Sequence, residues 1–118
     1  MYDINIFIIG VVKMQFIVTA YDGKDDEALA RRNRVREQHL ANAKKMIKKQ
    51  NLLYAAAILN DDNQMIGSVM IVDFPSKEIL INDWLNDDPY VTGNVWMEID
   101  IRPCRVPDFI LDTSSPSG

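Results

Sequence analysis

The hydrophobic residues of this chain recur at two spacings, every second position in some stretches and at helical spacing in another. The run 16–21 is rich in β-branched and aromatic residues and stops at the turn pair Asp22–Gly23, so it predicts a strand. Two further apolar runs, 52–59 and 65–74, enclose the polar residues 60–63. This arrangement predicts a β-hairpin.

The last predicted strand, residues 95–102, has the clearest alternation of apolar and polar positions. Its apolar side chains share one face, because successive side chains of a strand point to opposite faces. We therefore expect this face to pack on the core and the face that carries Trp96 to be mixed. The residues expected to face the core are Val95, Met97, Ile99 and Ile101.

Between the first strand and the hairpin, residues 24–50 have the pattern of an amphipathic helix. Acidic residues begin this segment and lysines end it, and both suit the helix dipole. Three polar residues, Arg32, Arg36 and His39, interrupt its apolar arc, so we expect all three on the face that packs against the sheet.

The elements are expected in the order strand, helix, strand, strand, helix, strand, where the second helix begins after the N-cap residue Ser76 and ends before Pro89. This is the ferredoxin-like βαββαβ arrangement of the α+β class, with an antiparallel sheet and helices on one face. A second copy of the same sheet is the simplest cover for the other face. We therefore expect a homodimer formed by sheet-to-sheet packing.

Composition narrows the classes of function. With 118 residues the chain has room for one core, and its net charge of -4 argues against nucleic acid as a partner. One cysteine and one histidine allow no internal disulfide and no zinc cluster, which favours a reducing, cytoplasmic location and no metal. The apolar run 4–12 is far shorter than the roughly 20 residues that cross a bilayer, so we expect neither an export signal nor membrane association.

The polar residues of the long helix have two interpretations each. A buried imidazole or guanidinium needs a partner or a cavity, because its burial alone is costly. His39 is either a structural residue satisfied by a backbone carbonyl or a group that takes part in chemistry. Arg32 and Arg36 either lay their stems over apolar surface or capture an anionic group, with Glu98 and Asp100 available as sheet carboxylates.

The segment 87–90, Asp-Asp-Pro-Tyr, follows the second predicted helix. Its residue types are those expected in a turn, and spacing alone favours that interpretation. The alternative is that the carboxylate of Asp88 holds an imidazole and stabilises its charged form, as acid–base sites require.

Over residues 14–105 the chain resembles the YciI-like (YCII-related) family of the dimeric α+β barrel superfamily. We expect this span to be the domain, with 1–13 as an N-terminal extension or extra strand and 106–118 as a C-terminal tail. The resemblance is carried by Arg32, Arg36, His39 and Leu40, by Leu53–Leu59, by Ile66-Gly67-Ser68-Val69, by Trp84-Leu85 and by Asp88-Pro89-Tyr90.

This resemblance implies a cleft in which a histidine and an aspartate form a catalytic pair, and the matching positions are His39 and Asp88. It also implies acid–base chemistry on a small molecule, of the elimination or isomerisation type, without a cofactor. The pocket candidates, which would suit an anionic ligand, are Arg32, Arg36, Ser68 and Tyr90.

The chain departs from the family pattern in its second strand. Relatives usually have a glycine after the paired alanines, whereas the run 55–58 has none, which would reshape the cleft. A different class of function stays open, namely a non-catalytic module that binds a small ligand or assembles with a partner protein. A sensor based on Cys104 ranks below both, because an isolated cysteine without a nearby base is more often inert.

Overall fold

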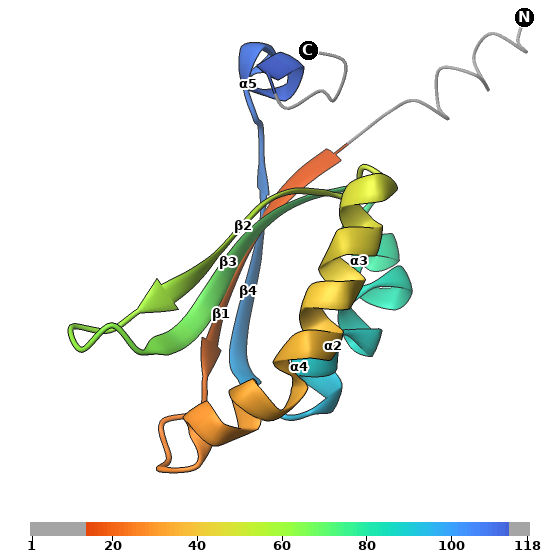
Figure 1. Ribbon diagram of the computed structural model, residues 1–118. Coiled ribbons are helices and arrows are strands. Elements are labelled where there is room, and N and C mark those ends of the chain that lie inside the picture. Colours follow the sequence, from red (N-terminus) through yellow and green to blue (C-terminus); the bar gives the residue numbers. More distant parts are fainter. Residues whose placement is uncertain (1–13, 114–118) are drawn as a thin grey trace, which may run out of the picture.

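The fold is built on one four-stranded antiparallel sheet with the strand order β2-β3-β1-β4 (Figure 1). The computed structural model describes residues 14–113, with the side chains of residues 14–111. The β2–β3 hairpin has the bounds that the sequence predicts. The strands are β1 (Met14–Asp22), β2 (Leu52–Leu59), β3 (Met65–Phe74) and β4 (Trp96–Cys104).

The helices that pack on this sheet lie on one of its faces (Figure 1). The longest, α2 (Ala28–Lys48), connects β1 to β2, whereas α3 (Lys77–Asp83), the 3-10 turn η1 (Leu85–Asp87) and α4 (Pro89–Thr92) connect β3 to β4. The order of the main elements is therefore βαββαβ, which confirms the predicted α+β, ferredoxin-like class. A last helix, α5 (Asp108–Thr113), lies beyond the end of β4 and away from the sheet (Figure 1).

The core lies between the sheet and its helices. Alternate residues of β1, among them Phe16 and Val18, are almost completely buried on the helix side. The register pairs them with Val72 and Met70 of β3, which are buried on the same side. Each such side chain contributes about 1.5–3 kcal/mol through burial, so this double row fixes which face of the sheet receives α2.

The start of α2 differs from the prediction, because the helix begins at Ala28 rather than at Lys24. The residues before it form a turn in which the Asp25 carbonyl accepts from the Ala28 N–H at 3.1 Å. The Asp25 carboxylate also forms an ion pair with Arg31, with an N–O distance of 2.7 Å. The hydrogen bond from Arg31 to the Asp25 carboxylate lowers the pKa of Asp25 to about 2. Asp25 therefore closes a surface turn instead of starting the helix.

The start of β4 also differs, and the prediction for two neighbouring residues was wrong. Trp96 is buried, with 5% of its surface exposed, whereas Met97 is 62% exposed. The cause is a register shift: Glu98 pairs with Tyr21 but Trp96 pairs with Asp22, so Met97 is the extra residue of a β-bulge. The bulge turns Trp96 toward the helices, where it becomes part of the core.

The sheet face away from the helices is largely apolar and lies open in a single chain. On this face Ile17 pairs with Ile71, and Thr19 with Val69, and all four residues are half-buried. Tyr54 of β2 continues the row and is 41% exposed.

Two predicted regions lie wholly or partly outside the described residues, the extension 1–13 and the end of the tail 106–118. The described part of the tail contains α5, whose Phe109 is 69% exposed. Among the helices of residues 14–113, none is long and apolar enough to cross a membrane.

Candidate active site

His39 and Asp88 meet in the layer between the sheet and the helices. The imidazole Nδ1 lies 2.8 Å from Asp88 Oδ1. Both side chains are buried, with 9% of the histidine side chain and 1% of the aspartate side chain exposed. His39 comes from the inner face of α2, and Asp88 from the turn between η1 and α4. The structure thus brings together two residues that are far apart in sequence.

Local structure fixes the Asp88 carboxylate independently of His39. Asp88 is the N-cap of α4, where its Oδ1 accepts from the Tyr90 backbone N–H at 2.9 Å, and Pro89 occupies the first helical position. Its Oδ2 accepts from the indole Nε1 of Trp84 at 2.9 Å. The segment therefore joins η1 to the short helix α4 rather than forming a simple turn, and its carboxylate is also aimed at the imidazole.

The contact between His39 and Asp88 defines the role of each imidazole nitrogen. A carboxylate can only accept, so Nδ1 carries the proton in the neutral ring and Nε2 carries the lone pair. Within the described residues, Nε2 makes no hydrogen bond. Nε2 is therefore the nitrogen available to exchange a proton with a ligand.

The aromatic ring of Tyr90 fixes the plane of the imidazole. The two rings stack with centroids 3.8 Å apart and planes 12° apart. Trp96 contacts both rings edge-on, with centroids 5.6 Å from His39 and 5.4 Å from Tyr90. Such offset and edge-on contacts stabilise a defined ring orientation.

Arg32 is buried in a second polar network beside this pair. Its Nη1 donates to both carboxylate oxygens of Asp22, at 3.0 and 3.2 Å, and its Nη2 donates to Ser68 Oγ at 2.9 Å. Ser68 Oγ also accepts from the indole Nε1 of Trp96 at 3.2 Å. Burial raises the pKa of Asp22, and the Arg32 guanidinium opposes that rise. The carboxylate that pairs with Arg32 is thus Asp22 and not Glu98 or Asp100.

Arg36 does not share this buried position, and the prediction that it would was wrong. Its side chain is exposed, like that of Leu40 one turn further along α2. It makes no ion pair with any residue between 14 and 111. It still lies near Tyr90, since both Arg32 and Arg36 oppose the rise that burial causes in the pKa of the Tyr90 hydroxyl.

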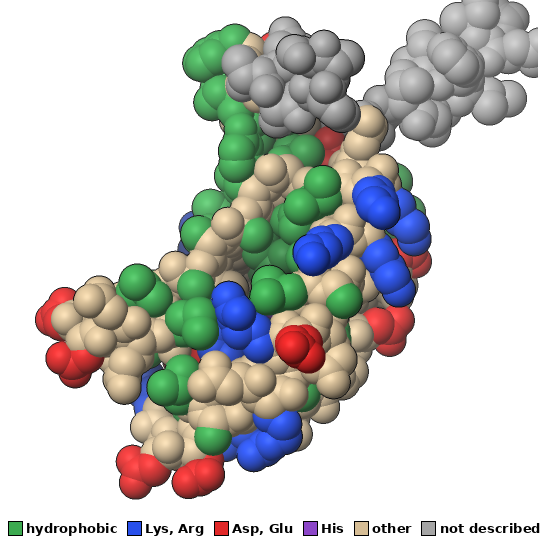
Figure 2. All heavy atoms as spheres, in the orientation of Figure 1, with side chains coloured by type: hydrophobic (Ala, Val, Ile, Leu, Met, Phe, Trp, Pro, Cys, Tyr) green, Lys and Arg blue, Asp and Glu red, His purple; other side chains and the backbone are tan. Residues whose placement is uncertain are grey.

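An open surface separates α2 from the β2 edge of the sheet. Ala55 and Ala57 pair with the buried residues Met70 and Ser68, so they belong to the helix side, and yet both are exposed. Figure 2 shows hydrophobic and basic side chains together between the strands and α2. We call this region the α2–β2 surface, and we define it by Arg36, Leu40, Ala55 and Ala57.

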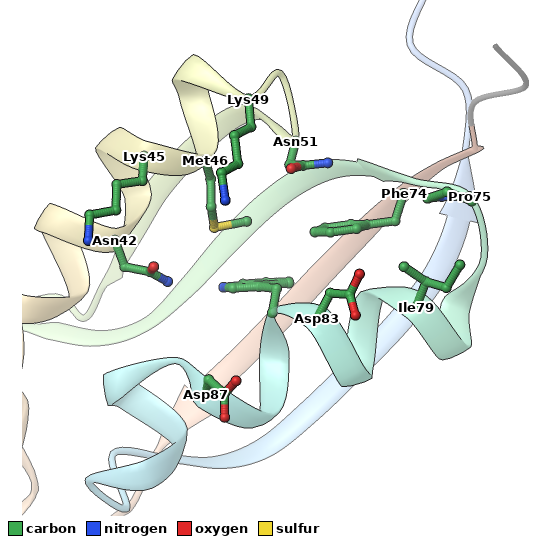
Figure 3. A pocket seen from close by; sticks show the side chains of 11 residues that line it. Asn42, Lys45, Met46, Lys49, Asn51, Phe74, Pro75, Ile79, Asp83 and Asp87 are labelled. Atoms are coloured by element: carbon green, nitrogen blue, oxygen red, sulfur yellow. The ribbon is translucent and has the colours of Figure 1, made fainter. Parts of the chain in front are cut away.

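A separate cleft of about 480 Å³ opens between the second half of α2 and α3 (Figure 3). Lys45 and Lys49 stand on one wall, and Asp83 and Asp87 on the other. Trp84 also lines this cleft and connects it to the His39–Asp88 pair, because its indole donates to Asp88.

Three residues were not predicted from the sequence as members of the site. Asp22 was taken as part of a turn, although it continues the alternation of Phe16, Val18 and Ala20 and is only 6% exposed. That alternation was a usable signal. Trp84 was named only among the residues that carry the family resemblance, and Trp96 was expected on the other face of the sheet. Nothing in the alternation of residues 95–102 signalled the bulge.

Other candidate chemistry is weak. Burial raises the pKa of the Cys104 thiol, which disfavours the reactive thiolate. Among the described residues, no three His, Cys, Asp or Glu side chains gather in a group that could hold a metal ion.

The fold and the site together define a small ferredoxin-like α+β protein with a buried histidine–aspartate pair on its helix side. The family model of the YCII-related domain matches residues 14–105. The chain belongs to this YciI-like family, as the resemblance predicts.

Two relatives illustrate the match. An uncharacterized protein of Haemophilus influenzae is 31% identical over 98 residues, which cover 78% of this chain and 97% of that protein. The solved structure of 5-chloro-2-hydroxyhydroquinone dehydrochlorinase from Burkholderia phenoliruptrix, in complex with 2,5-dihydroxybenzoquinone, has a TM-score of 0.67 and 19% identity. That match covers 81% of this chain and 98% of the other, and it establishes the common fold.

Proposed function

We propose that this protein is a small-molecule enzyme in which Nε2 of His39 takes and returns a proton while Asp88 orients the imidazole and stabilises its charged form. The observation that supports this most is the buried contact of 2.8 Å between Nδ1 and Asp88 Oδ1, with Nε2 unbonded within the described residues. A positioned general base typically contributes about 10²–10⁴-fold to a rate.

The reaction class that suits such a pair is elimination or isomerisation. In an elimination the base takes a proton from the substrate, and the leaving group departs with the electron pair of the bond that breaks. In an isomerisation the proton returns to a different atom of the same molecule. Both reactions balance without an oxidant or a reductant, so the histidine and aspartate suffice in principle.

The ligand that fits best is a small planar molecule with a negatively charged oxygen. Arg36 is exposed and without an ion-pair partner in the described chain, which leaves its charge for an anionic group. The small side chains of Ala55 and Ala57 leave room for a ring on the α2–β2 surface. The ligand of the Burkholderia enzyme, 2,5-dihydroxybenzoquinone, has this chemistry.

We further propose that the protein acts as a homodimer that pairs the two open sheet faces. The half-buried row formed by Ile17, Val69 and Ile71 supports this arrangement, because an apolar sheet face needs a cover. Helices already occupy the other face, so the second copy leaves the His39–Asp88 pair in its place.

The test is chloride release from 5-chloro-2-hydroxyhydroquinone and related chlorinated hydroxyhydroquinones. We expect the protein to release chloride faster than buffer alone. We also expect Arg36→Met to raise KM by roughly 10–100-fold, because a charge-assisted hydrogen bond contributes about 1.5–3 kcal/mol.

The matched control is Arg34→Met, which removes an exposed charge from the other side of the same helix and should leave KM unchanged. Equal rates with and without the protein would contradict the proposal. Binding of 2,5-dihydroxybenzoquinone without chloride release would favour the non-catalytic module instead.

A further inference from the structure

Tyr90 lies between two planar groups, each of which is held by its own carboxylate. The imidazole of His39 covers one side of the ring at 3.8 Å. The Arg32 guanidinium carbon lies 4.6 Å from the ring centroid, and since the imidazole occupies one face, the guanidinium takes the other. Asp88 binds the imidazole and Asp22 binds the guanidinium. Two side chains, each held by its own carboxylate, thus enclose one tyrosine.

From this arrangement we infer that Arg32 is a positioning residue that acts on His39 through Tyr90, and that it does not bind the substrate. The inference rests on the proposed function for its catalytic consequence, but its structural part does not depend on any reaction. It assigns to Arg32 a role different from the one that the family resemblance suggests.

The contacts of Arg32 leave nothing for a ligand. Only 3% of the residue is exposed. Nη1 and Nη2 are committed to Asp22 and Ser68, and Nε is buried without a hydrogen-bond partner within the described residues. A substrate anion would have to displace the Asp22 carboxylate to reach the guanidinium. Leaving Asp22 charged, buried and unpaired would be costly.

The same contacts are well suited to fixing the plane of the Arg32 guanidinium. Asp22 ends β1 and Ser68 lies on the neighbouring strand β3, so two strands of the sheet set the orientation of the guanidinium. The planar fork of arginine transmits that orientation, whereas a lysine ammonium would keep the charge but not the plane. The guanidinium lies over the ring of Tyr90, which is itself only 1% exposed.

His39 needs this support because one hydrogen bond does not fix a ring. The contact between Nδ1 and Asp88 leaves the imidazole free to rotate about that contact. Such a rotation would turn Nε2 away from a bound ligand. The stack on Tyr90, with planes 12° apart, removes the rotation. A displacement of about 1 Å at a reacting atom can cost on the order of 10²-fold in rate.

The direct test is proton NMR of the His39 ring, which is unambiguous because the chain has one histidine. Stacking on Tyr90 should displace the carbon-bound imidazole protons upfield through the ring current. In Arg32→Met and Arg32→Lys we expect much of this displacement to be lost, whereas Arg34→Met should keep it. Full retention of the displacement in folded Arg32→Met and Arg32→Lys would overturn the inference.

Ser68→Ala provides a milder variant in case the Arg32 variants do not fold. It removes one acceptor of the guanidinium but keeps the Asp22 ion pair, so we expect a partial loss of the displacement. An unchanged displacement in folded Ser68→Ala would also count against the inference.

Kinetics separate positioning from substrate binding. A positioning role predicts that Arg32→Lys lowers kcat by about 10–100-fold with KM unchanged. A raised KM with the parental kcat would overturn the inference and leave the proposed function standing. Conversely, if the protein transfers no proton at all, loss of the ring-current displacement would still establish the Arg32–Tyr90–His39 contact.

Discussion

Asp88→Ala is expected to lower the free energy of unfolding by about 3–5 kcal/mol, because each buried donor left without an acceptor costs about 1–3 kcal/mol. The substitution leaves three donors without an acceptor: the imidazole Nδ1 of His39, the indole Nε1 of Trp84 and the backbone N–H of Tyr90. The Asp88 side chain caps α4 through the last of these hydrogen bonds, so the cap is lost as well. Urea denaturation followed by far-ultraviolet circular dichroism measures the change.

Asp87→Ala is the matched control, because Asp87 precedes Asp88 directly but is exposed. We expect this control to change the stability by no more than about 0.5 kcal/mol, as surface substitutions usually do. Similar small changes for both variants would mean that Asp88 is not the centre of the network.

The second large effect is expected at His39. His39→Gln removes the group that takes the proton while retaining a side chain of similar reach, so we expect chloride release from 5-chloro-2-hydroxyhydroquinone to fall by about 10²–10⁴-fold. Initial rates at saturating substrate measure this, with circular dichroism to verify the fold. A folded His39→Gln variant that keeps most of the parental rate would rule out His39 as the base, whatever the substrate.

Much of the fold could be predicted because its signals are local. The hairpin of β2 and β3 follows from two apolar runs around a polar turn, and Ser76 caps α3 by accepting from the Ile79 N–H at 3.1 Å. The bulge at Met97 could not be predicted, since it depends on how β4 meets Tyr21 and Asp22 of another strand. The alternation of apolar and polar residues along β4 gives no sign of the extra residue.

The site divides in the same way. The helical spacing identified Arg32 and His39 as polar residues on a buried face, but it placed Arg36 there too, although its side chain is exposed. The pairing of His39 with Asp88 came from the family resemblance, because spacing alone favoured a simple turn. The alternation along β1 signals that Asp22 is buried, but the contact that makes it the partner of Arg32 is identified only in the structure.

The central claim is that Asp88 holds the proton of neutral His39 on Nδ1 and so leaves Nε2 as the proton acceptor. The nitrogen chemical shifts of the single imidazole, recorded by NMR at a pH where the ring is neutral, test this most directly. We expect a protonated Nδ1 and an unprotonated Nε2. A neutral ring with its proton on Nε2 would contradict it.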